Sequence, residues 1–157
     1  MVSFILNSLS KCFRRRSGFE IYTDGSFKEG RGAWAYVLVL DGDLIREDSA
    51  WLRKTSSNRM EFQAAIEALK ALPEKSKAVV YTDSKILVDI MTNKISQWRA
   101  GDWVKSKGQP IPNVDLIKEL DQYNQRHFIK WQWVRGHAGI KYNERCDQLC
   151  IRARTMM

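Results

Sequence analysis

Long apolar runs, internal repeats and low-complexity tracts are all missing from this chain of 157 residues. A membrane-spanning helix needs roughly 20 consecutive apolar residues, and no stretch approaches that length. Hydrophobic residues nevertheless make up 44% of the chain, which is enough for a sizeable core. The sequence therefore predicts one compact domain, with no membrane association and a cytoplasmic location as the default.

Cysteine is also scarce, and the three residues present form no recognisable framework. Cys12 stands alone, while Cys146 and Cys150 are four residues apart in a predicted helix. An odd number without paired spacing argues against a secreted protein held together by disulfides. We interpret Cys146 and Cys150 as thiols packed in the core, with a metal-binding pair as the alternative.

Acidic residues are outnumbered, with 18 Asp and Glu against 26 Lys and Arg, which gives a net charge of +8 and a pI near 9.5. The excess is local, because residues 1–18 contribute +4 and residues 94–108 contribute +3. Localised positive charge predicts a polyanionic partner, with nucleic acid as the first candidate and an anionic membrane surface as the second.

Residues 1–18 contain no acid, and their Ser and Arg content is loosely similar to that of an organellar transit peptide. The segment is short for that role. A secretory signal peptide fits worse, because the basic cluster follows the apolar stretch. We expect a basic N-terminal extension, with organellar targeting as the alternative.

Hydrophobic periodicity from residue 19 onwards switches between strand and helix patterns. Strands are predicted at residues 19–23, 33–40, 44–52, 78–82 and 129–134. Helices are predicted from Ser57 or Asn58 to Pro73, from Asp83 to about Met91, from 113 to 125, and from Tyr142 to about Arg154. Residues 94–112 break the pattern. The order predicts an α/β fold, in which an antiparallel meander and parallel strands form a five-stranded mixed sheet flanked by helices.

Four carboxylates occupy positions that suggest a joint site. Asp24 ends the first predicted strand and Asp83 ends the fourth. If these strands are parallel neighbours, the two acids lie side by side at the edge where open α/β sheets place their sites. Glu61 lies in the first turn of a helix and Asp147 lies in the last helix. Each acid also has an ordinary explanation, as turn chemistry or as a favourable charge near a helix start.

A cluster of such acids needs a cation, because carboxylates repel one another and lose hydration when buried. Oxygen ligands favour Mg²⁺ or Mn²⁺ over Zn²⁺. Two such ions, roughly 3.5–4 Å apart, would stabilise the attacking and leaving oxygens of a phosphodiester. The residues alone leave both the metal site and the ordinary explanations open.

Several short motifs resemble those of type 1 ribonuclease H, the cellular enzyme. They are Thr23-Asp24-Gly25-Ser26, Asn58-Arg59-Met60-Glu61, Thr82-Asp83-Ser84, Gly136-His137-Ala138-Gly139 and Asn143-Glu144-Arg145-Cys146-Asp147. They follow the family's order and approximate spacing over residues 19–154, and the set is far more specific than any single motif. The resemblance implies the ribonuclease H fold and an enzyme that hydrolyses the RNA strand of RNA–DNA hybrids, leaving 5′-phosphate and 3′-hydroxyl ends.

The resemblance also implies roles for particular side chains. Asp24, Glu61, Asp83 and Asp147 would bind two Mg²⁺ ions, for which Mn²⁺ could substitute, and Asp24 would bridge the two. His137 would assist proton transfer or product release, which suits a side chain that titrates near neutrality. Without the motif, a lone histidine would be interpreted as an ordinary surface or core residue.

Residues 94–112 are similar to the family's basic protrusion. In that case Trp98 and Trp103 would order the segment, while Arg99, Lys105 and Lys107 would face DNA phosphates. A solvated loop with two aromatic anchors is the alternative.

Other positions match the family's contacts with the hybrid. Recognition of RNA depends on its 2′-hydroxyl groups in the minor groove. Ser57, Asn58 and Lys85 would lie at this groove, and Ser56 would contact a DNA phosphate.

Two departures from the family pattern are visible. Residues 27–32 are shorter and more charged than the glycine-rich loop of many bacterial members, so that loop's RNA contacts do not carry over directly. Ser57 and Lys85 stand where Asn and Gln are frequent. Neither departure affects the four acids, so we expect an active monomer that needs no small-molecule cofactor. A non-catalytic hybrid-binding module and a DNA-acting member of the same fold are the alternatives.

Overall fold

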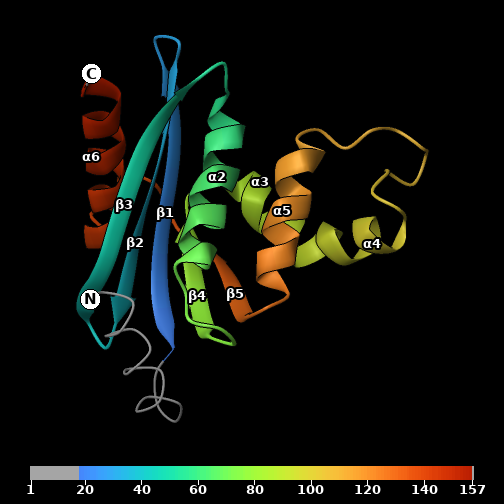
Figure 1. Ribbon diagram of the computed structural model, residues 1–157, viewed down its shortest axis with the longest axis horizontal. Helices are drawn as coiled ribbons and strands as arrows, with labels where there is room; N and C mark the ends of the chain where they lie inside the picture. The colour runs from blue at the N-terminus through green and yellow to red at the C-terminus, as the bar shows by residue number, and fades with distance from the viewer. Residues whose placement is uncertain (1–17, 157) are drawn as a thin grey trace.

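A five-stranded mixed sheet forms the centre of the structure, a computed structural model that describes residues 18–156 (Figure 1). In the order β3-β2-β1-β4-β5, its strands are Asp43–Arg53 (β3), Arg31–Leu40 (β2), Phe19–Lys28 (β1), Lys77–Thr82 (β4) and Phe128–Trp133 (β5). β1, β2 and β3 are antiparallel, whereas β4 is parallel to β1 and β5 is parallel to β4. The predicted α/β fold is therefore confirmed. Apart from Gly18, the predicted N-terminal extension lies outside the described residues.

Helices cover both faces of the sheet (Figure 1). On one face α2 (Ser57–Lys70) packs against β1 and β2, and α5 (Val114–Asn124) packs against α2. On the other face α6 (Lys141–Thr155) lies across β1, β2 and β3. Within residues 18–156, no helix combines the length and the apolar character needed to cross a membrane.

The central strand β2 needs cover on both faces, because every one of its residues after Arg31 is buried. Trp34 and Tyr36 belong to the core beneath α2. Ala33 belongs to a second core, where small strand residues allow α6 to pack closely with Cys146 and Cys150. Both cysteines are free and buried, which confirms the interpretation of packed thiols.

β1 is longer than the sequence indicated. The Asp-Gly-Ser pattern at residues 24–26 predicts a turn, yet β1 continues through it to Lys28 and pairs with β2 at each step. The turn is formed instead by Glu29 and Gly30, both with the positive φ that a tight two-residue hairpin turn requires. The expected strand end at Thr23 is therefore wrong, because ladder pairing outweighs the local turn preference.

The helix expected to end near Met91 is also longer. α3 (Lys85–Asp89), the π-helical segment η1 (Ile90–Lys94) and α4 (Ile95–Ala100) follow one another without a gap. They carry the chain into residues 94–112, which project from the side of the domain (Figure 1) and are called the projection below. Ile95 and Ile111 are buried and fix the projection to the core at its two ends. The interpretation of the whole segment as irregular is therefore wrong for its first part, because Ile95 prolongs the buried helical stripe.

Candidate active site

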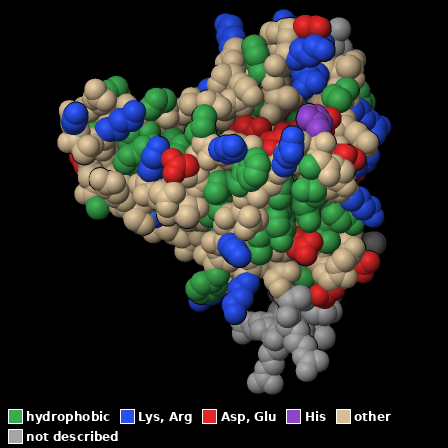
Figure 2. All heavy atoms as spheres, turned by 180° about the vertical axis from the view of Figure 1, so that it is seen from behind, with side chains coloured by type: hydrophobic (Ala, Val, Ile, Leu, Met, Phe, Trp, Pro, Cys, Tyr) green, Lys and Arg blue, Asp and Glu red, His purple; other side chains and the backbone are tan. Residues whose placement is uncertain are grey.

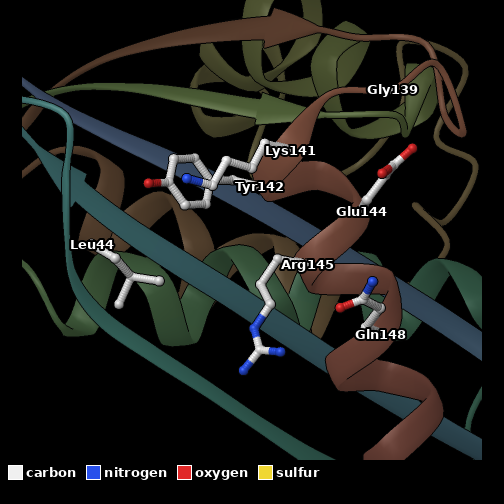
Figure 3. A pocket seen from close by; sticks show the side chains of 7 residues that line it. All are labelled: Leu44, Gly139, Lys141, Tyr142, Glu144, Arg145 and Gln148. Atoms are coloured by element: carbon white, nitrogen blue, oxygen red, sulfur yellow. The ribbon is translucent and has the colours of Figure 1, made fainter.

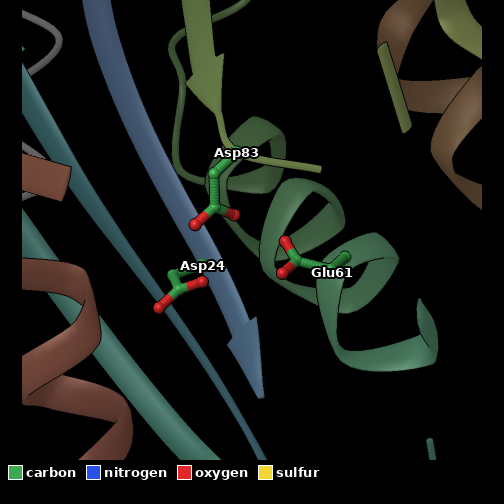
Figure 4. A group of neighbouring side chains, drawn as sticks. All are labelled: Asp24, Glu61 and Asp83. Carbon is green, nitrogen blue, oxygen red and sulfur yellow. The ribbon is translucent and has the colours of Figure 1, made fainter. Parts of the chain in front are cut away.

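The edge of the sheet at which β4 ends brings two acids together. Thr23 of β1 pairs with Thr82, the last residue of β4, and the two strands are parallel. Asp24 on the continuing β1 and Asp83 directly after β4 are therefore neighbours at this edge (Figure 4). The condition under which the sequence placed these two acids side by side, that their strands are parallel neighbours, is met.

Glu61 reaches the same edge from α2 (Figure 4). At Gly25, a Cβ atom would lie 2.3 Å from the backbone nitrogen of Glu61, closer than any side chain could tolerate. Glycine is required here because the helix backbone comes so close to the strand, not because a turn is needed. This approach places the Glu61 carboxylate beside Asp24.

Asp24, Glu61 and Asp83 form one cluster. Each offers a carboxylate oxygen, and these oxygens all lie within 4.8 Å of one another. Asp24 and Glu61 are each only 8% exposed, and Asp83 is half-buried. Glu61 Oε2 is buried and has no hydrogen-bond partner among the described residues. An unsatisfied carboxylate oxygen beside two further acids fits a site that binds a cation.

Asp147 is the one predicted acid outside this group of ligand-distance oxygens. It lies half-buried on α6, and its charge raises the pKa of both Asp24 and Asp83. The structure thus brings three of the four predicted acids together and leaves the fourth within electrostatic range.

Burial, together with the crowding of negative charge, raises the pKa of all three acids in the cluster. Burial, followed by the charges of Asp83 and Asp147, raises the pKa of Asp24 to about 7. Burial, followed by the charges of Asp24 and Asp83, raises the pKa of Glu61 well above its usual range. Burial also raises the pKa of Asp83, while His137 acts in the opposite direction. A divalent cation with oxygen ligands would supply the missing positive charge, so these residues fit such an ion.

The backbone around Asp83 is fixed by its neighbours. The Ser84 N–H donates to Thr82 Oγ1 at 3.1 Å, and Ser84 caps α3. The indole N–H of Trp133 donates to the backbone carbonyl of Asp83 at 3.1 Å. The sequence showed Trp133 only as one residue of an alternating strand. Its contact with Asp83 depends on the pairing of β5 with β4, for which the sequence carries no local signal.

His137 lies in the connection between β5 and α6. Its side chain is exposed, and its φ of 52° is in the left-handed region. A Cβ atom on the preceding Gly136 would lie 2.7 Å from Asp83 Oδ2, so a glycine at 136 lets this connection pass close to the cluster.

A shallow groove of about 360 Å³ opens beside the cluster and includes three of the predicted minor-groove residues. Its lining consists of Ser57, Asn58, Glu61, Asp83, Ser84, Lys85, Ile86 and Trp133. Lys85 Nζ lies 4.9 Å from the centre of the Trp133 ring. Lys85, Ser57 and Asn58 are exposed, so they are accessible to a ligand in the groove.

Ser56 has a structural role at the start of α2. Its Oγ accepts the backbone N–H of Arg59 at 3.2 Å, so Ser56 is the N-cap. The expected cap at Ser57 or Asn58 is wrong by one or two residues, because it is the Ser56 hydroxyl that accepts the free backbone N–H of Arg59.

The predicted phosphate contacts of the projection divide into two kinds. Arg99 donates from Nε and Nη2 to the carboxylate of buried Asp121, at 2.8 and 2.6 Å, and so ties the projection to α5. Trp98 and Trp103 pack against the core as predicted anchors. Two further cations carry no ion pair in the described chain: Lys105, which is half-buried, and Lys107, which is exposed.

A larger hollow of about 550 Å³ lies at the start of α6 (Figure 3). It is lined by Leu44, Gly139, Lys141, Tyr142, Glu144, Arg145 and Gln148. Arg145 is bound there to Glu47 at 2.6 Å. This hollow contains none of the clustered carboxylates, so its size does not make it the active site.

Comparison with known proteins agrees with this site. The family model described as RNase H matches residues 16–155. Ribonuclease H of Aeromonas salmonicida (strain A449) is 44% identical over 132 residues, which covers 83% of this chain and 85% of that protein. Ribonuclease H of Hahella chejuensis is 42% identical over 132 residues, covering 83% of this chain and 88% of the relative.

A solved structure extends the likeness to the fold. LC9-RNase H1, described as a type 1 RNase H with the type 2 active-site motif, superposes with a TM-score of 0.71 at 29% identity. The match covers 88% of this chain and 74% of that one. Since the family model spans most of the sequence and both relatives exceed 40% identity, this chain belongs to the ribonuclease H family and is a nuclease of that family.

Proposed function

We propose that the chain hydrolyses the RNA strand of RNA–DNA hybrids, and that Asp24, Glu61, Asp83 and Asp147 hold two divalent metal ions for this reaction. The observation that carries the proposal is the group of three carboxylates within 4.8 Å, two of them buried and none in an ion pair with a Lys or Arg of the described residues. Oxygen ligands favour Mg²⁺, with Mn²⁺ as a substitute. Membership of the family supports the hybrid as substrate.

The residues of the site would divide the work of hydrolysis. The ions, when bound, activate water and stabilise charge on the phosphate. Asp24 lies within ligand distance of Glu61 and Asp83, and burial and the charges of Asp83 and Asp147 raise its pKa, so it would contribute to holding both ions. The oxygen of water bonds to phosphorus, the bond to O3′ breaks, and O3′ takes up a proton, which leaves 5′-phosphate and 3′-hydroxyl ends. His137 is exposed beside the cluster and would assist this proton transfer or product release.

Binding of the hybrid would use surfaces on both sides of the carboxylates. Ser57, Asn58 and Lys85 line the groove next to Glu61 and would contact the minor groove. Figure 2 shows Lys and Arg side chains on the surface of the projection. There Lys105 and Lys107 would contact DNA phosphates, with Trp98 and Trp103 holding the segment in place.

The remaining predicted contacts change in weight. Arg99 is bound to Asp121, so we assign it to holding the projection instead of binding phosphate. Ser56 uses its hydroxyl as an acceptor for the α2 cap and could still donate its proton to a phosphate. All proposed groups come from one chain, so the proposal needs only a monomer.

Cleavage of strand-labelled substrates tests the proposal directly. RNA–DNA hybrid, RNA duplex and DNA duplex are incubated with and without Mg²⁺, and the ends of the products are identified. We expect Mg²⁺-dependent cleavage of the RNA strand of the hybrid only. Asp24→Asn should abolish it, whereas Asp43→Asn, an exposed acid at the start of β3, should not. Binding of the hybrid without any product in Mg²⁺ or Mn²⁺ would instead indicate a non-catalytic module.

A further inference from the structure

Three strands carry a row of cations at the end of the sheet beyond the carboxylates. Lys28 of β1 pairs with Arg31 of β2, and Arg31 pairs with Arg53 of β3. Residues directly opposite one another in neighbouring strands project from the same face, so the three side chains stand side by side. Like charges in this arrangement destabilise a sheet, so the stability of the fold does not explain the row.

A fourth cation joins the row from the end of α6. Arg154 donates to Ser26 Oγ, and Arg31 Nη1 donates to the backbone carbonyl of Arg154 at 3.0 Å. These contacts tie α6 to the hairpin between β1 and β2. We call Lys28, Arg31, Arg53 and Arg154 the cationic row.

An aromatic ring orders two of these side chains. The guanidinium carbons of Arg31 and Arg53 lie 5.8 and 5.7 Å from the centre of the Trp51 ring. Stacking of this kind restricts a guanidinium group while leaving its N–H donors available. A preordered cation loses less conformational entropy when it binds an anion.

Three members of the cationic row differ from other cations of the described chain in their partners. Lys28, Arg53 and Arg154 form no ion pair with an acid within residues 18–156. By contrast, Arg99 and Arg145 each bind a carboxylate at 2.6 Å. Lys28 and Arg53 are exposed, so their charge faces solvent.

The cationic row continues the strand face that carries the first catalytic acid. Asp24, Ser26 and Lys28 alternate along one face of β1, which places Ser26 and Lys28 roughly 7 and 14 Å beyond Asp24 at about 3.4 Å per residue. The projection lies on the other side of the carboxylates. Figure 2 shows Lys and Arg side chains on the projection at the left and again at the top of the view, with Asp and Glu side chains between them.

We propose that the cationic row binds backbone phosphates of the strand that is cut, beyond the scissile bond and on the side away from the projection. This inference rests on the proposed function, because the carboxylates define where the scissile phosphate lies. The row is continuous with Asp24, so the strand bound next to Asp24 is the one that reaches it. Exposed cations that form no ion pair in the described chain, here Lys28 and Arg53, suit phosphates, whose contacts dominate the affinity of proteins for nucleic acids.

The test measures how hybrid binding depends on salt. Lys28→Gln with Arg53→Gln removes two charges and leaves two shorter, uncharged polar side chains. Lys75→Gln with Lys77→Gln is the matched control, because both lysines are exposed and unpaired near the opposite end of the sheet. Both pairs are placed in an Asp83→Asn background, so that the hybrid is not cut. Thermal unfolding confirms that each variant is folded.

We expect the slope of log affinity against log salt concentration to fall by roughly 1–2 in the row variant, since each phosphate contact contributes about 0.9 on B-form DNA. The control should keep the parental slope, and Arg53→Lys should restore part of it. The measurement is repeated with hybrids that are extended on one side of the cut or on the other. The decrease in slope should appear only with the hybrids extended on the side away from the projection. Equal slopes for the row variant and the control would overturn the inference. That result is also expected if the cationic row binds an anionic membrane and not the hybrid.

Failure of the proposed function would give a different result. Cleavage by the unmodified protein is measured on the same hybrids. If it cuts them and the slopes are equal, the cationic row alone is wrong. If it cuts nothing while the row variant loses salt dependence, the row binds nucleic acid and the proposed reaction is wrong.

Discussion

Two buried carboxylate sites in this protein are treated in opposite ways. Asp121 in α5 is 2% exposed and accepts hydrogen bonds from Arg99 at 2.8 and 2.6 Å and from Gln125 at 2.9 Å. Asp24 and Glu61 are each 8% exposed, yet neither forms an ion pair with a Lys or Arg among residues 18–156. The first site is satisfied by side chains of the protein, whereas the second has no Lys or Arg partner among the described residues.

The difference separates a structural use of buried charge from a chemical one. Removing a carboxylate from water is costly, and an arginine that binds it offsets much of that cost. The Asp121 site gains a tie between the projection and α5. In the cluster at Asp24 no arginine offsets the free-energy cost of removing the carboxylates from water. A bound divalent ion would offset it. The two sites should therefore respond to substitution in opposite ways.

The largest contrast is expected at Glu61. Glu61→Gln keeps the shape of the side chain and removes its charge, so a bound ion loses one ligand and much of its electrostatic stabilisation. We expect hybrid cleavage in Mg²⁺ to fall by orders of magnitude, while the unfolding temperature of the metal-free protein stays the same or rises. Activity within a few-fold of the parent would contradict the assignment of Glu61 as a ligand.

The second-largest difference between the Asp24 cluster and the Asp121 site is expected in the pH dependence of stability. The pKa of Asp24 in the folded protein is about 7, above its ordinary value of 3.8. The folded state binds this proton more tightly than the unfolded chain does, so protonation of Asp24 stabilises the fold. This contribution to the free energy of unfolding is fully present below about pH 4 and is lost as pH rises through 7. Metal-free protein should therefore lose stability over this window relative to Asp24→Asn.

Added Mg²⁺ provides the control for that pH dependence. An ion that binds only the folded state raises the unfolding temperature. The rise should be clear at pH 8, above the pKa of about 7 for Asp24, and absent in Asp24→Asn. Scanning calorimetry at several pH values, with and without Mg²⁺, measures both effects. Identical pH profiles for the parent and Asp24→Asn would show that the burial of Asp24 has no such consequence.

Substitution at the completed site should affect stability alone. Asp121→Asn leaves Arg99 without its carboxylate, and we expect the free energy of unfolding to fall by roughly 2–3 kcal/mol. This is less than the loss of a fully buried pair, because the Arg99 side chain is 38% exposed and partly screened by solvent. Cleavage per folded molecule should stay close to that of the parent. If Asp121→Asn remained folded but lost more than tenfold in activity, the assignment of a purely structural role to Asp121 would be wrong.

The sequence predicted much of this comparison, but not all of it. The Asp-Gly-Ser and Thr-Asp-Ser motifs mark Asp24 and Asp83, and hydrophobic periodicity places each of them at the end of a predicted strand. The pattern could not show that β1 continues past Asp24, because the pairing partner at Ala35 lies in another strand. Nor could it show that Gly25 is required for the approach of α2, since that depends on a contact with the backbone of Glu61.

The projection shows a second feature that the sequence could not predict, namely which of its basic residues has an acidic partner. Its basic composition indicated a binding surface, and Trp98 and Trp103 were correctly expected to anchor it. Composition could not distinguish Arg99 from Lys107, because only the fold brings Asp121 to Arg99 and leaves Lys107 exposed. Charges are read easily from a sequence, whereas their partners depend on tertiary packing.

The smallest effect that we predict concerns Trp133, which no motif marked. Trp133→Phe keeps the aromatic ring beneath Lys85 and removes the N–H that donates to the Asp83 carbonyl. Groups that orient a metal ligand typically change affinity or activity by about 10–100-fold, and a hydrogen bond to the backbone of Asp83 belongs at the lower end. We expect kcat to fall about tenfold, and the Mg²⁺ concentration for half-maximal activity to rise.

The matched variant Lys85→Met tests whether the ring matters instead. It removes the cation above Trp133 and leaves the hydrogen bond to Asp83 intact, so KM for the hybrid should rise with little change in the Mg²⁺ requirement. A merely structural role of Trp133 would lower the unfolding temperature without moving the Mg²⁺ requirement. If Trp133→Phe and Lys85→Met change the same parameter, the indole N–H does not position Asp83, and the clustered acids owe their geometry to the strand ends alone.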